Sequence, residues 1–429
     1  RNVSAAIRRL GGWQHNAARV LPEKQRIDDR VAGFFVPVIL IVSLLTFFIW
    51  VFFGGIDVVS HGLFAALSVL VVACPCVIGL ATPVALAAGL NKAARNHILI
   101  RDTSALEQMR NVDVVVFDKT GTLTEGHPTV IGWLWAQGQE EHYKDVLLAA
   151  ESTSDHPLAE AIVTALEGEE QVIPAHLDGF ENITGKGVRV AYQGAEYWVG
   201  SHKLLKDYQA NLSDILADML TQYESDGNSI VYFGRENDLL AVIAIKDQLR
   251  VTSMEAIREL RTQDIEICML TGDGERTASS VAGSLGIMRF VADAMPDDKE
   301  DFIHKLQLQG KTVAMVGDGV NDAQALSCAD VSIAMGKGTD TLMDTAMITL
   351  RTSDLLLLPK VFRLSRQTVS LMYRNLFWAF IYNTVGIFVA AGVLYPVYDI
   401  LLSPALAGAA MALSCVSVAL SSLRLSSRF

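Results

Sequence analysis

Four long stretches without a charged residue constrain what this chain can fold into more than any other feature of its sequence. They cover residues 31–56, 62–91, 376–398 and 400–423. A helix of about 20 apolar residues crosses the hydrocarbon core of a bilayer, and each stretch is long enough to do so. Four core helices of a soluble protein are the alternative, which such lengths disfavour. We therefore expect a multi-pass α-helical membrane protein with one large charged middle segment.

The distribution of lysine and arginine predicts how these helices are oriented. Residues 1–30 contain seven of these basic residues, and Arg424 and Arg428 follow the last apolar stretch. The short connections near residues 57–61 and 396–399 contain none. Because basic residues concentrate on the cytoplasmic side of a membrane, we expect both termini and the middle segment in the cytoplasm, and a location in the plasma (inner) membrane.

The net charge and the cysteines exclude two classes of protein. The net charge is −12 at neutral pH, which argues against a nucleic-acid partner. Three of the five cysteines, Cys74, Cys76 and Cys415, lie in the apolar stretches. This arrangement does not suggest a disulfide framework.

The middle segment reads as one domain interrupted by another. Apolar runs that alternate with helical stretches predict a parallel, doubly wound α/β sheet. These runs are residues 112–117, 240–245, 266–270, 312–316 and 331–334. Between the first two, helical runs at 143–150 and 158–166 precede alternating strands at 188–192 and 197–199, which predicts an inserted α+β domain. The expected domains are helix pairs at 31–100 and 359–429, the α/β domain at 101–124 and 239–358, and the insertion at 125–238.

The residues Asp-Lys-Thr-Gly-Thr-Leu-Thr at 118–124 follow the first apolar strand. A strand that ends in Asp118 places a carboxylate at the carboxyl edge of a parallel sheet, where α/β folds bind ligands. Lys119 adds a cation, and the glycine lets the backbone turn sharply. An aspartate in this position can act as a nucleophile that carries a phosphoryl group.

Two further loops follow apolar strands in the same way, at residues 271–274 (Thr-Gly-Asp-Gly) and 317–322 (Gly-Asp-Gly-Val-Asn-Asp). We expect all three loops to meet at one edge of the sheet. Asp118, Asp318 and the carbonyl of Thr120 would supply oxygens to Mg²⁺, a hard ion that prefers such ligands. The remaining groups would bind phosphoryl oxygens or position the metal: Thr271, Gly272, Asp273, Lys299, Asn321 and Asp322.

These three loops resemble the phosphorylation domain of P-type ATPases, within the haloacid-dehalogenase-like superfamily, and the resemblance covers about residues 22–429. It implies an aspartyl-phosphate formed from MgATP and a nucleotide-binding insertion. Within the insertion, Glu151, His156-Pro157 and the pair Gly185 and Gly187 are similar to the adenine-site motifs of the heavy-metal subgroup. Taken alone, His156-Pro157 is a common helix start.

Cys74-Pro75-Cys76 lies inside the second apolar stretch. Proline opens a helix, and polar groups at membrane depth are expensive and usually functional. The alternative is two small cysteines that pack against neighbouring helices. The motif resembles the ion-site signature of heavy-metal P-type ATPases.

The third and fourth stretches contain no carboxylate, lysine or histidine, which favours a soft ion, Cu(I) or Ag(I), over Zn²⁺ or Cd²⁺. Tyr382-Asn383, and Met411 with Ser414, resemble the copper subgroup. Taken alone, Met411 and Ser414 are typical helix-packing residues. Cys415 stands where that subgroup usually has serine, so it is either an extra ligand or, as we favour, a packing residue. Asp29 matches an entry-side acidic position or is an ordinary interfacial charge.

No Thr-Gly-Glu sequence occurs, and in P-type ATPases that loop of the actuator domain positions the hydrolytic water. Residues 1–30 resemble the segments that flank an actuator domain, so we expect a chain that lacks this domain and the first membrane helices.

The leading hypothesis is an ATP-driven Cu(I) or Ag(I) exporter that works with a lipid bilayer, ATP and a soft ion that a metallochaperone could deliver. The alternatives are a Zn²⁺/Cd²⁺ exporter and a fragment that does not turn over. A membrane-tethered phosphatase is least favoured.

Overall fold

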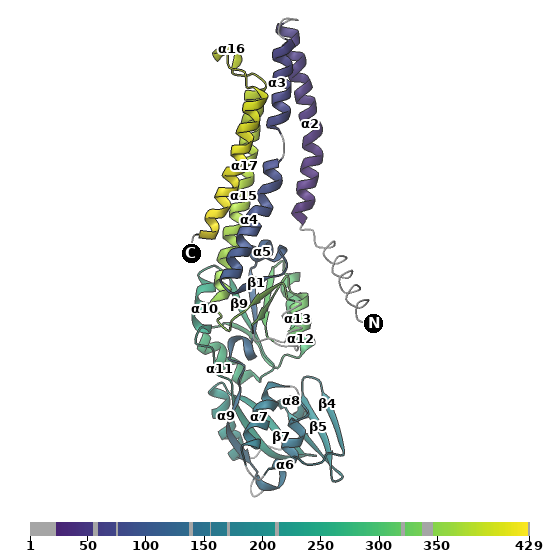
Figure 1. Cartoon of the computed structure of the whole chain (residues 1–429). Helices are drawn as coiled ribbons and strands as arrows, with labels where there is room; N and C mark the ends of the chain where they lie inside the picture. The colour runs from purple at the N-terminus through teal and green to yellow at the C-terminus, as the bar shows by residue number, and fades with distance from the viewer. Residues whose placement is uncertain are drawn as a thin grey trace, which may run out of the picture. The chain divides into compact units, whose positions relative to one another are not determined.

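The computed structural model describes residues 23–54, 59–73, 76–136, 140–154, 156–169, 172–210, 214–318, 322–336 and 346–427. The chain divides into two compact units (Figure 1). The first unit comprises Arg1–Asn96 and Arg363–Phe429, and the second comprises His97–Phe362. The expected segments at residues 1–22, and the Cys74-Pro75 pair, lie outside the described residues.

The first unit is helical. Its helices are α2 (Glu23–Gly54), α3 (Val59–Val72), α4 (Cys76–Arg95), α15 (Leu357–Ala390, which begins in the second unit), α16 (Tyr395–Tyr398) and α17 (Pro404–Ser427). Among the described residues, two windows are long and apolar enough to cross a membrane, Val36–Phe53 and Pro404–Arg424. Only 17% of each window is buried, so most of these apolar side chains face outward, as they do in lipid.

The first and fourth stretches are confirmed as helices long and apolar enough to cross a membrane, whereas the helices of the second and third stretches have other bounds than the apolar stretches themselves. The second stretch is divided between α3, with 14 residues, and α4. The third stretch ends at Ala390, because Gly392 adopts a positive φ of 94° and the chain turns before it enters α16.

Hydrogen bonds from these helices, to another helix or to the connection before α17, satisfy buried polar groups. Ser68 Oγ donates to the carbonyl of Leu402 at 2.6 Å, and Asn375 Nδ2 donates to Ser422 Oγ at 3.0 Å. Such bonds hold membrane helices together where apolar burial offers little preference.

The second unit contains the parallel sheet that the sequence predicts. Six parallel strands run in the order β13-β12-β11-β2-β9-β10, and β1 joins β13 at the edge in antiparallel register. The strands are β1 (Ile98–Ile100), β2 (Val114–Asp118), β9 (Glu266–Leu270), β10 (Arg289–Val291), β11 (Val313–Gly317), β12 (Val331–Met335) and β13 (Ile348–Leu350). The central strands are fully buried, which explains their continuous apolar sequence.

Helices cover this sheet on two sides. Figure 1 shows α10 (Ser253–Arg261) and α11 (Glu275–Leu285) on one side, and α12 (Pro296–Leu308) and α13 (Ala323–Cys328) on the other. The short helix α5 (Ser104–Met109) precedes β2. This is the doubly wound arrangement that alternating strands and helices predict.

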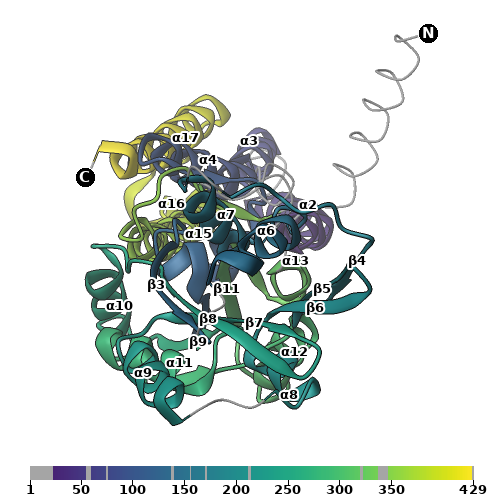
Figure 2. The same ribbon diagram turned by 90° about the horizontal axis from the view of Figure 1, so that it is seen from below.

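The insertion forms a six-stranded antiparallel sheet in the order β3-β8-β7-β6-β5-β4, which can be followed across Figure 2. Its strands are β3 (Thr129–Trp135), β4 (Gly179–Ile183), β5 (Gly187–Tyr192), β6 (Ala195–Gly200), β7 (Ser229–Arg235) and β8 (Asp238–Lys246). Its helices are α6 (Glu140–Glu151), α7 (Pro157–Glu167), α8 (His202–Asp207) and α9 (Asp214–Ser225). Both predicted helical runs and both predicted strands are therefore confirmed.

One strand assignment is wrong. The run at residues 240–245 does not belong to the parallel sheet, because β8 pairs antiparallel with β3 and β7 in the second sheet. A fully buried apolar run fits either sheet, so its periodicity does not distinguish them. The second sheet consequently extends to Lys246, beyond the boundary expected at residue 238.

We predict that Gly187→Ala destabilises the inserted sheet. Gly187 has a φ of 144°, and a Cβ atom there would lie 2.1 Å from the carbonyl oxygen of Val199. Gly194, in the following turn, also has a positive φ (77°) but no atom within 4 Å of its Cβ position, so Gly194→Ala is the matched control. We expect Gly187→Ala to cost about 2 kcal/mol more than the control, because it adds overpacking to the shared strain. Amide hydrogen exchange of β5 and β6 measures the difference, and equal protection in both variants would contradict the prediction.

Candidate phosphate site

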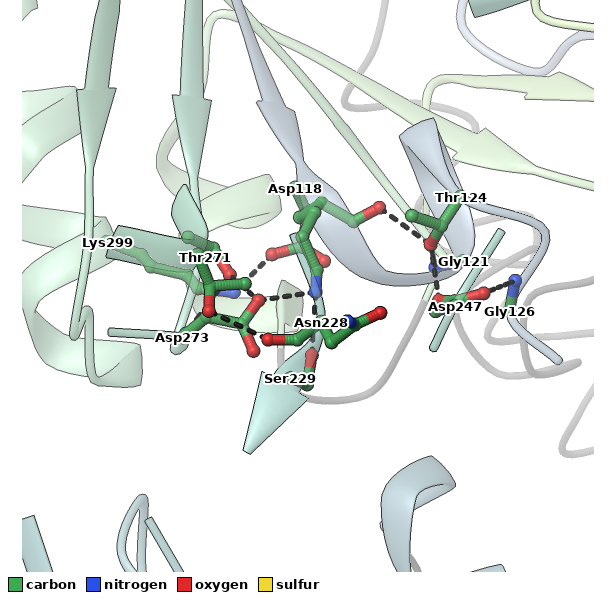
Figure 3. A network of polar contacts seen from close by, with 12 residues as sticks. Asp118, Gly121, Thr124, Gly126, Asn228, Ser229, Asp247, Thr271, Asp273 and Lys299 are labelled. Carbon is green, nitrogen blue, oxygen red and sulfur yellow. Dashed lines mark hydrogen bonds and ion pairs between the residues drawn. The ribbon is translucent and has the colours of Figure 1, made fainter. Parts of the chain in front are cut away.

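The carboxyl ends of β11, β2 and β9 form the candidate site. These strands are adjacent, so the loops that follow Gly317, Asp118 and Leu270 meet at one edge of the sheet. The structure therefore brings together the described parts of the three predicted acidic loops, and Figure 3 shows residues of the first two. Asn321 and the two residues before it lie outside the described residues.

Lys299 connects the candidate nucleophile to a second carboxylate. Its Nζ donates to Asp118 Oδ1 at 2.6 Å and to Asp322 Oδ1 at 2.7 Å. All three side chains are buried, and Lys299 comes from the first turn of α12. Burial alone would lower the pKa of Lys299, but the charges of Asp118 and Asp322 outweigh it and raise the pKa. The ammonium group thus stays charged where a phosphoryl group would sit.

Asp118, Asp318 and Asp322 form a candidate cation site. Their carboxylate oxygens lie within 4.8 Å of one another. Burial and the neighbouring Asp118 charge raise the pKa of Asp318 and of Asp322 to about 7. Two buried carboxylates and the half-buried Asp318, with one lysine, leave an excess of negative charge, which a hard divalent cation with oxygen ligands would neutralise. The donor set therefore fits Mg²⁺, whereas no described contact tests the predicted role of the Thr120 carbonyl.

Lys119 faces the second loop. Its Nζ forms an ion pair with Asp273 and donates to Ser229 Oγ at 3.0 Å. Burial acts to raise the pKa of Asp273, but the Lys119 ammonium and hydrogen bonds outweigh it and lower the pKa. Thr271 Oγ1 donates to Asp273 Oδ2 at 2.8 Å, so this hydroxyl is fixed beside Asp118 (Figure 3). Gly272 follows as an exposed residue of the same turn.

The loop after Asp118 needs a glycine for two reasons. Gly121 has a φ of 69°, and a Cβ atom there would lie 1.5 Å from Asp318 Oδ2. A larger residue would push Asp318 away from the other two carboxylates. The sequence alone predicts a glycine here because the backbone turns sharply. The structure shows a second reason, since only a residue without a Cβ atom leaves room for Asp318.

Several residues that hydrogen-bond to the loop after Asp118 were not predicted from the sequence. Asp247 accepts hydrogen bonds from Thr124 Oγ1 at 2.5 Å and from the Gly126 amide at 3.1 Å. Arg250 Nε donates to the Thr122 carbonyl at 2.9 Å, and Ser253 Oγ donates to the Leu123 carbonyl at 2.7 Å. The signal for Asp247 was present, since it directly follows an apolar strand as Asp118 does. Ser229 carried no comparable signal.

The nucleotide candidates lie in the inserted domain. His156 caps α7, with Pro157 at its first position, and its Nδ1 accepts from the Leu158 amide at 3.2 Å. A neutral ring that accepts at Nδ1 carries its proton on Nε2. The side chain of His156 is exposed, but partial desolvation by the surrounding protein lowers its pKa although Asp273 and Asp118 act to raise it, which favours the neutral ring at pH 7. The common helix-start role is therefore present, and Nε2 remains a possible donor to a base.

Glu151 and two glycines complete this group. Glu151 ends α6 and is buried, and burial raises its pKa to about 7. Gly185 has a φ of 70°, and its Cβ position lies 3.0 Å from the Met295 side chain. Gly187 lies where β5 and β6 approach closely, so backbone packing alone requires it. Binding roles for these glycines remain predictions.

The structure describes part of the candidate ion path. Cys74 is outside the described residues, and Cys76 begins α4 with its side chain undescribed. Asn383 Nδ2 and Ser414 Oγ are buried and have no hydrogen-bond partner among the described residues. Met411 packs with Cys415 against a cluster of Ala81, Ala379 and Val418, whereas the Tyr382 side chain is exposed.

Comparisons with known proteins agree with this geometry. The haloacid dehalogenase-like hydrolase family matches residues 112–330. A copper-exporting P-type ATPase of Legionella pneumophila is 43% identical over 401 residues, which cover 94% of this chain and 54% of the relative. A silver exporting P-type ATPase of Salmonella typhimurium is 44% identical over 406 residues, which cover 94% and 49%. The chain thus spans about half the length of the curated relatives it matches.

Two solved structures are also similar. A zinc-transporting PIB-type ATPase in the E2.Pi state has a TM-score of 0.66 and 32% identity, with 92% of this chain and 63% of that chain covered. The catalytic domain of the CPx-ATPase CopB-B, studied for its conformational changes upon nucleotide binding, has a TM-score of 0.53 and 28% identity, with 63% and 96% covered. The second match assigns the α/β domain and its insertion to a known catalytic domain fold.

We predict that Glu151→Gln stabilises the chain as pH rises. The pKa of Glu151 is about 7 in the folded chain against an ordinary value of 4.5. Because the pKa is higher in the folded chain, the free energy of unfolding falls as pH rises from 4.5 to about 7, by at most about 3 kcal/mol. Glutamine does not ionise, so its advantage in free energy of unfolding should be near zero at about pH 4 and reach its maximum above about pH 7. The free energies of unfolding of the unsubstituted chain and of Glu151→Gln, measured across this pH range, test the prediction.

The exposed Glu167, at the end of α7, supplies the control. Glu167→Gln makes the same substitution at a solvent-exposed position, so the comparison isolates the effect of burying the carboxyl. A gain in free energy of unfolding for Glu151→Gln that does not increase with pH would contradict a raised pKa for the buried Glu151 carboxyl.

Proposed function

The chain belongs to the haloacid dehalogenase-like hydrolase family, and on that premise we propose that it is the catalytic and ion-conducting part of a P-type ATPase that exports Cu(I) or Ag(I). The observation that carries this proposal is the position of Asp118. It ends the central strand β2, between the loops that follow β9 and β11, and it contacts Lys299 at 2.6 Å. A buried carboxylate surrounded by donors and by two further carboxylates suits a phosphoryl acceptor.

Phosphoryl transfer would proceed by in-line attack. A carboxylate oxygen of Asp118 forms a bond to the γ-phosphorus of ATP, the bond from that phosphorus to the bridging oxygen breaks, and ADP leaves with the electron pair. Lys299 would neutralise charge on the phosphoryl oxygens, and the hydroxyl of Thr271 would hydrogen-bond to one of them once its hydrogen turns away from Asp273. Mg²⁺, held by Asp118, Asp318 and Asp322, would supply additional charge stabilisation.

The neutral ring of His156 and the carboxyl of Glu151 support nucleotide binding by the insertion. Nε2–H of His156 can donate to a purine nitrogen, or the ring can stack on the base. Near neutral pH, part of the Glu151 population is protonated and can also donate. The nearby positive-φ turn at Gly185 allows the backbone to approach a ligand.

The ion is proposed from the ligand set. Cys74, Cys76 and Met411 offer sulfur, and Asn383 and Ser414 offer buried polar atoms that lack described partners. The apolar parts of α15 and α17 contain no carboxylate. Sulfur without carboxylate favours Cu(I) or Ag(I). The similarity to a zinc-transporting structure supports Zn²⁺ as the second candidate.

The membrane location, the topology and the lipid partner of the chain are proposed from the pattern of basic and apolar residues. We propose a plasma (inner) membrane location, with both termini and the catalytic unit in the cytoplasm, because basic residues lie at the ends of the apolar stretches. The lipid bilayer surrounds α2 and α17, whose apolar residues face outward. A cytosolic metallochaperone that delivers Cu(I) is the proposed protein partner.

The ion that stimulates phosphorylation tests this function. We expect Cu(I) or Ag(I) to increase acid-stable labelling of the chain from γ-labelled ATP about tenfold more than Zn²⁺ does, because soft ions prefer thiolate ligands. Replacement of Cys74 and Cys76 by serine should remove the stimulation and leave nucleotide binding unchanged. Equal stimulation by Zn²⁺ would favour the zinc exporter, and labelling that no ion affects would contradict an ion-coupled pump.

A further inference from the structure

Three side chains with different metal-binding atoms converge on α12 and α13, separate from the three carboxylates of the phosphate site. Glu300 and His304 are four residues apart on α12, so they share one helix face. Cys328 is the last residue of α13. The ligand atoms of the three residues all lie within 4.8 Å of one another.

Two of the three distances between these atoms match a tetrahedral metal site, and the third is below 4.8 Å. Cys328 Sγ lies 3.3 Å from Glu300 Oε1, and His304 Nε2 lies 3.5 Å from the same oxygen. Tetrahedral bonds of about 2.0–2.3 Å place neighbouring ligand atoms roughly 3.3–3.7 Å apart. The side chains of His304 and Glu300 are 51% and 36% exposed, so a water molecule can reach the fourth position.

Gln307 fixes the tautomer of the histidine. Its Nε2 donates to the Cys328 carbonyl at 2.8 Å, so its Oε1 must be the atom that lies 3.1 Å from His304 Nδ1. An oxygen can only accept, and Nδ1 of His304 therefore carries the proton. In the neutral ring this leaves the Nε2 lone pair free beside Glu300. Such a supporting contact, on the ring nitrogen away from the ion, is typical of metal-binding histidines.

We propose that Glu300, His304 and Cys328 bind one Zn²⁺ ion that joins α12 to α13. One thiolate, one imidazole and one carboxylate suit a borderline divalent ion better than a hard ion or Cu(I). The ion would tie together α12, which carries Lys299 directly before Glu300, and α13, which Asp322 precedes at its N-cap; Lys299 Nζ and Asp322 Oδ1 are 2.7 Å apart. The bound ion would thus hold α12 and α13 in place beside the phosphate site. This role is independent of which ion the membrane helices transport.

Cobalt substitution tests the site, because a thiolate bound to Co²⁺ gives a sulfur-to-metal charge-transfer absorption that oxygen ligands do not give. The full chain is used in detergent with Cys74 and Cys76 replaced by serine, which removes the sulfur of the candidate ion path. We expect one equivalent of Co²⁺ to produce the absorption and one equivalent of Zn²⁺ to remove it. Zn²⁺ should also raise the melting temperature of the chain.

Substitutions in the same background assign the ligands. Cys328→Ser should abolish the absorption. His304→Ala should weaken Co²⁺ binding at least about tenfold, since loss of a group that merely supports a ligand already weakens metal binding by that factor. His176, an exposed histidine of the insertion, is the matched control, and His176→Ala should change nothing. An absorption that persists in Cys328→Ser would overturn the proposal. So would an absorption that is lost in Cys328→Ser but unchanged in His304→Ala, since binding would then involve the thiol alone.

Discussion

The mutual repulsion of three carboxylates, two of them buried and one half-buried, is the constraint on which the second unit depends. Asp118, Asp318 and Asp322 hold their oxygens within 4.8 Å of one another, and Lys299 neutralises only part of that charge. The cost is visible in Asp318 and Asp322, whose pKa is raised to about 7 by burial and by Asp118. A folded protein keeps such an arrangement only if the surrounding structure enforces it, and a bound cation would relieve it. The same geometry that is unfavourable without a cation is therefore suited to phosphoryl transfer.

The surrounding structure enforces this arrangement through the inserted domain as well as through the parallel sheet. Strand β8 of the insertion ends at Lys246, and the residues that follow it, Asp247 and Arg250, hold the loop after Asp118. The amide of Glu125 also donates to the carbonyl of Gln248 at 2.8 Å, so the two connections of the insertion are joined. At the start of β7, Ser229 accepts a hydrogen bond from Lys119. The insertion is thus attached to the loop after Asp118 by side chains, which would couple the proposed nucleotide site to the proposed phosphoryl acceptor.

The sequence predicted the parts of this arrangement that arise from strand order and failed where tertiary pairing decides. Asp118, Thr271 and Asp318 each follow a buried apolar strand, and parallel strands present such residues at one edge. Strand β8 has the same apolar character but belongs to the other sheet, and only its pairing with β3 and β7 reveals this. Lys119 was expected beside Asp118, yet its ammonium contacts Asp273 and Ser229, because side-chain direction depends on partners far apart in sequence. Gly187 was assigned to nucleotide binding, although close packing of β5 on β6 also requires a glycine there.

The central claim is that Asp118 accepts the phosphoryl group, and mapping of the acyl phosphate tests it most directly. The full chain is phosphorylated with MgATP and then reduced with borohydride, which converts a phosphorylated aspartate to homoserine, and the modified residue is identified by peptide mass spectrometry. We predict homoserine at position 118 alone, dependent on ATP and absent from Asp118→Asn. Homoserine at Asp318, Asp322 or Asp273, or at position 118 without ATP, would contradict the account.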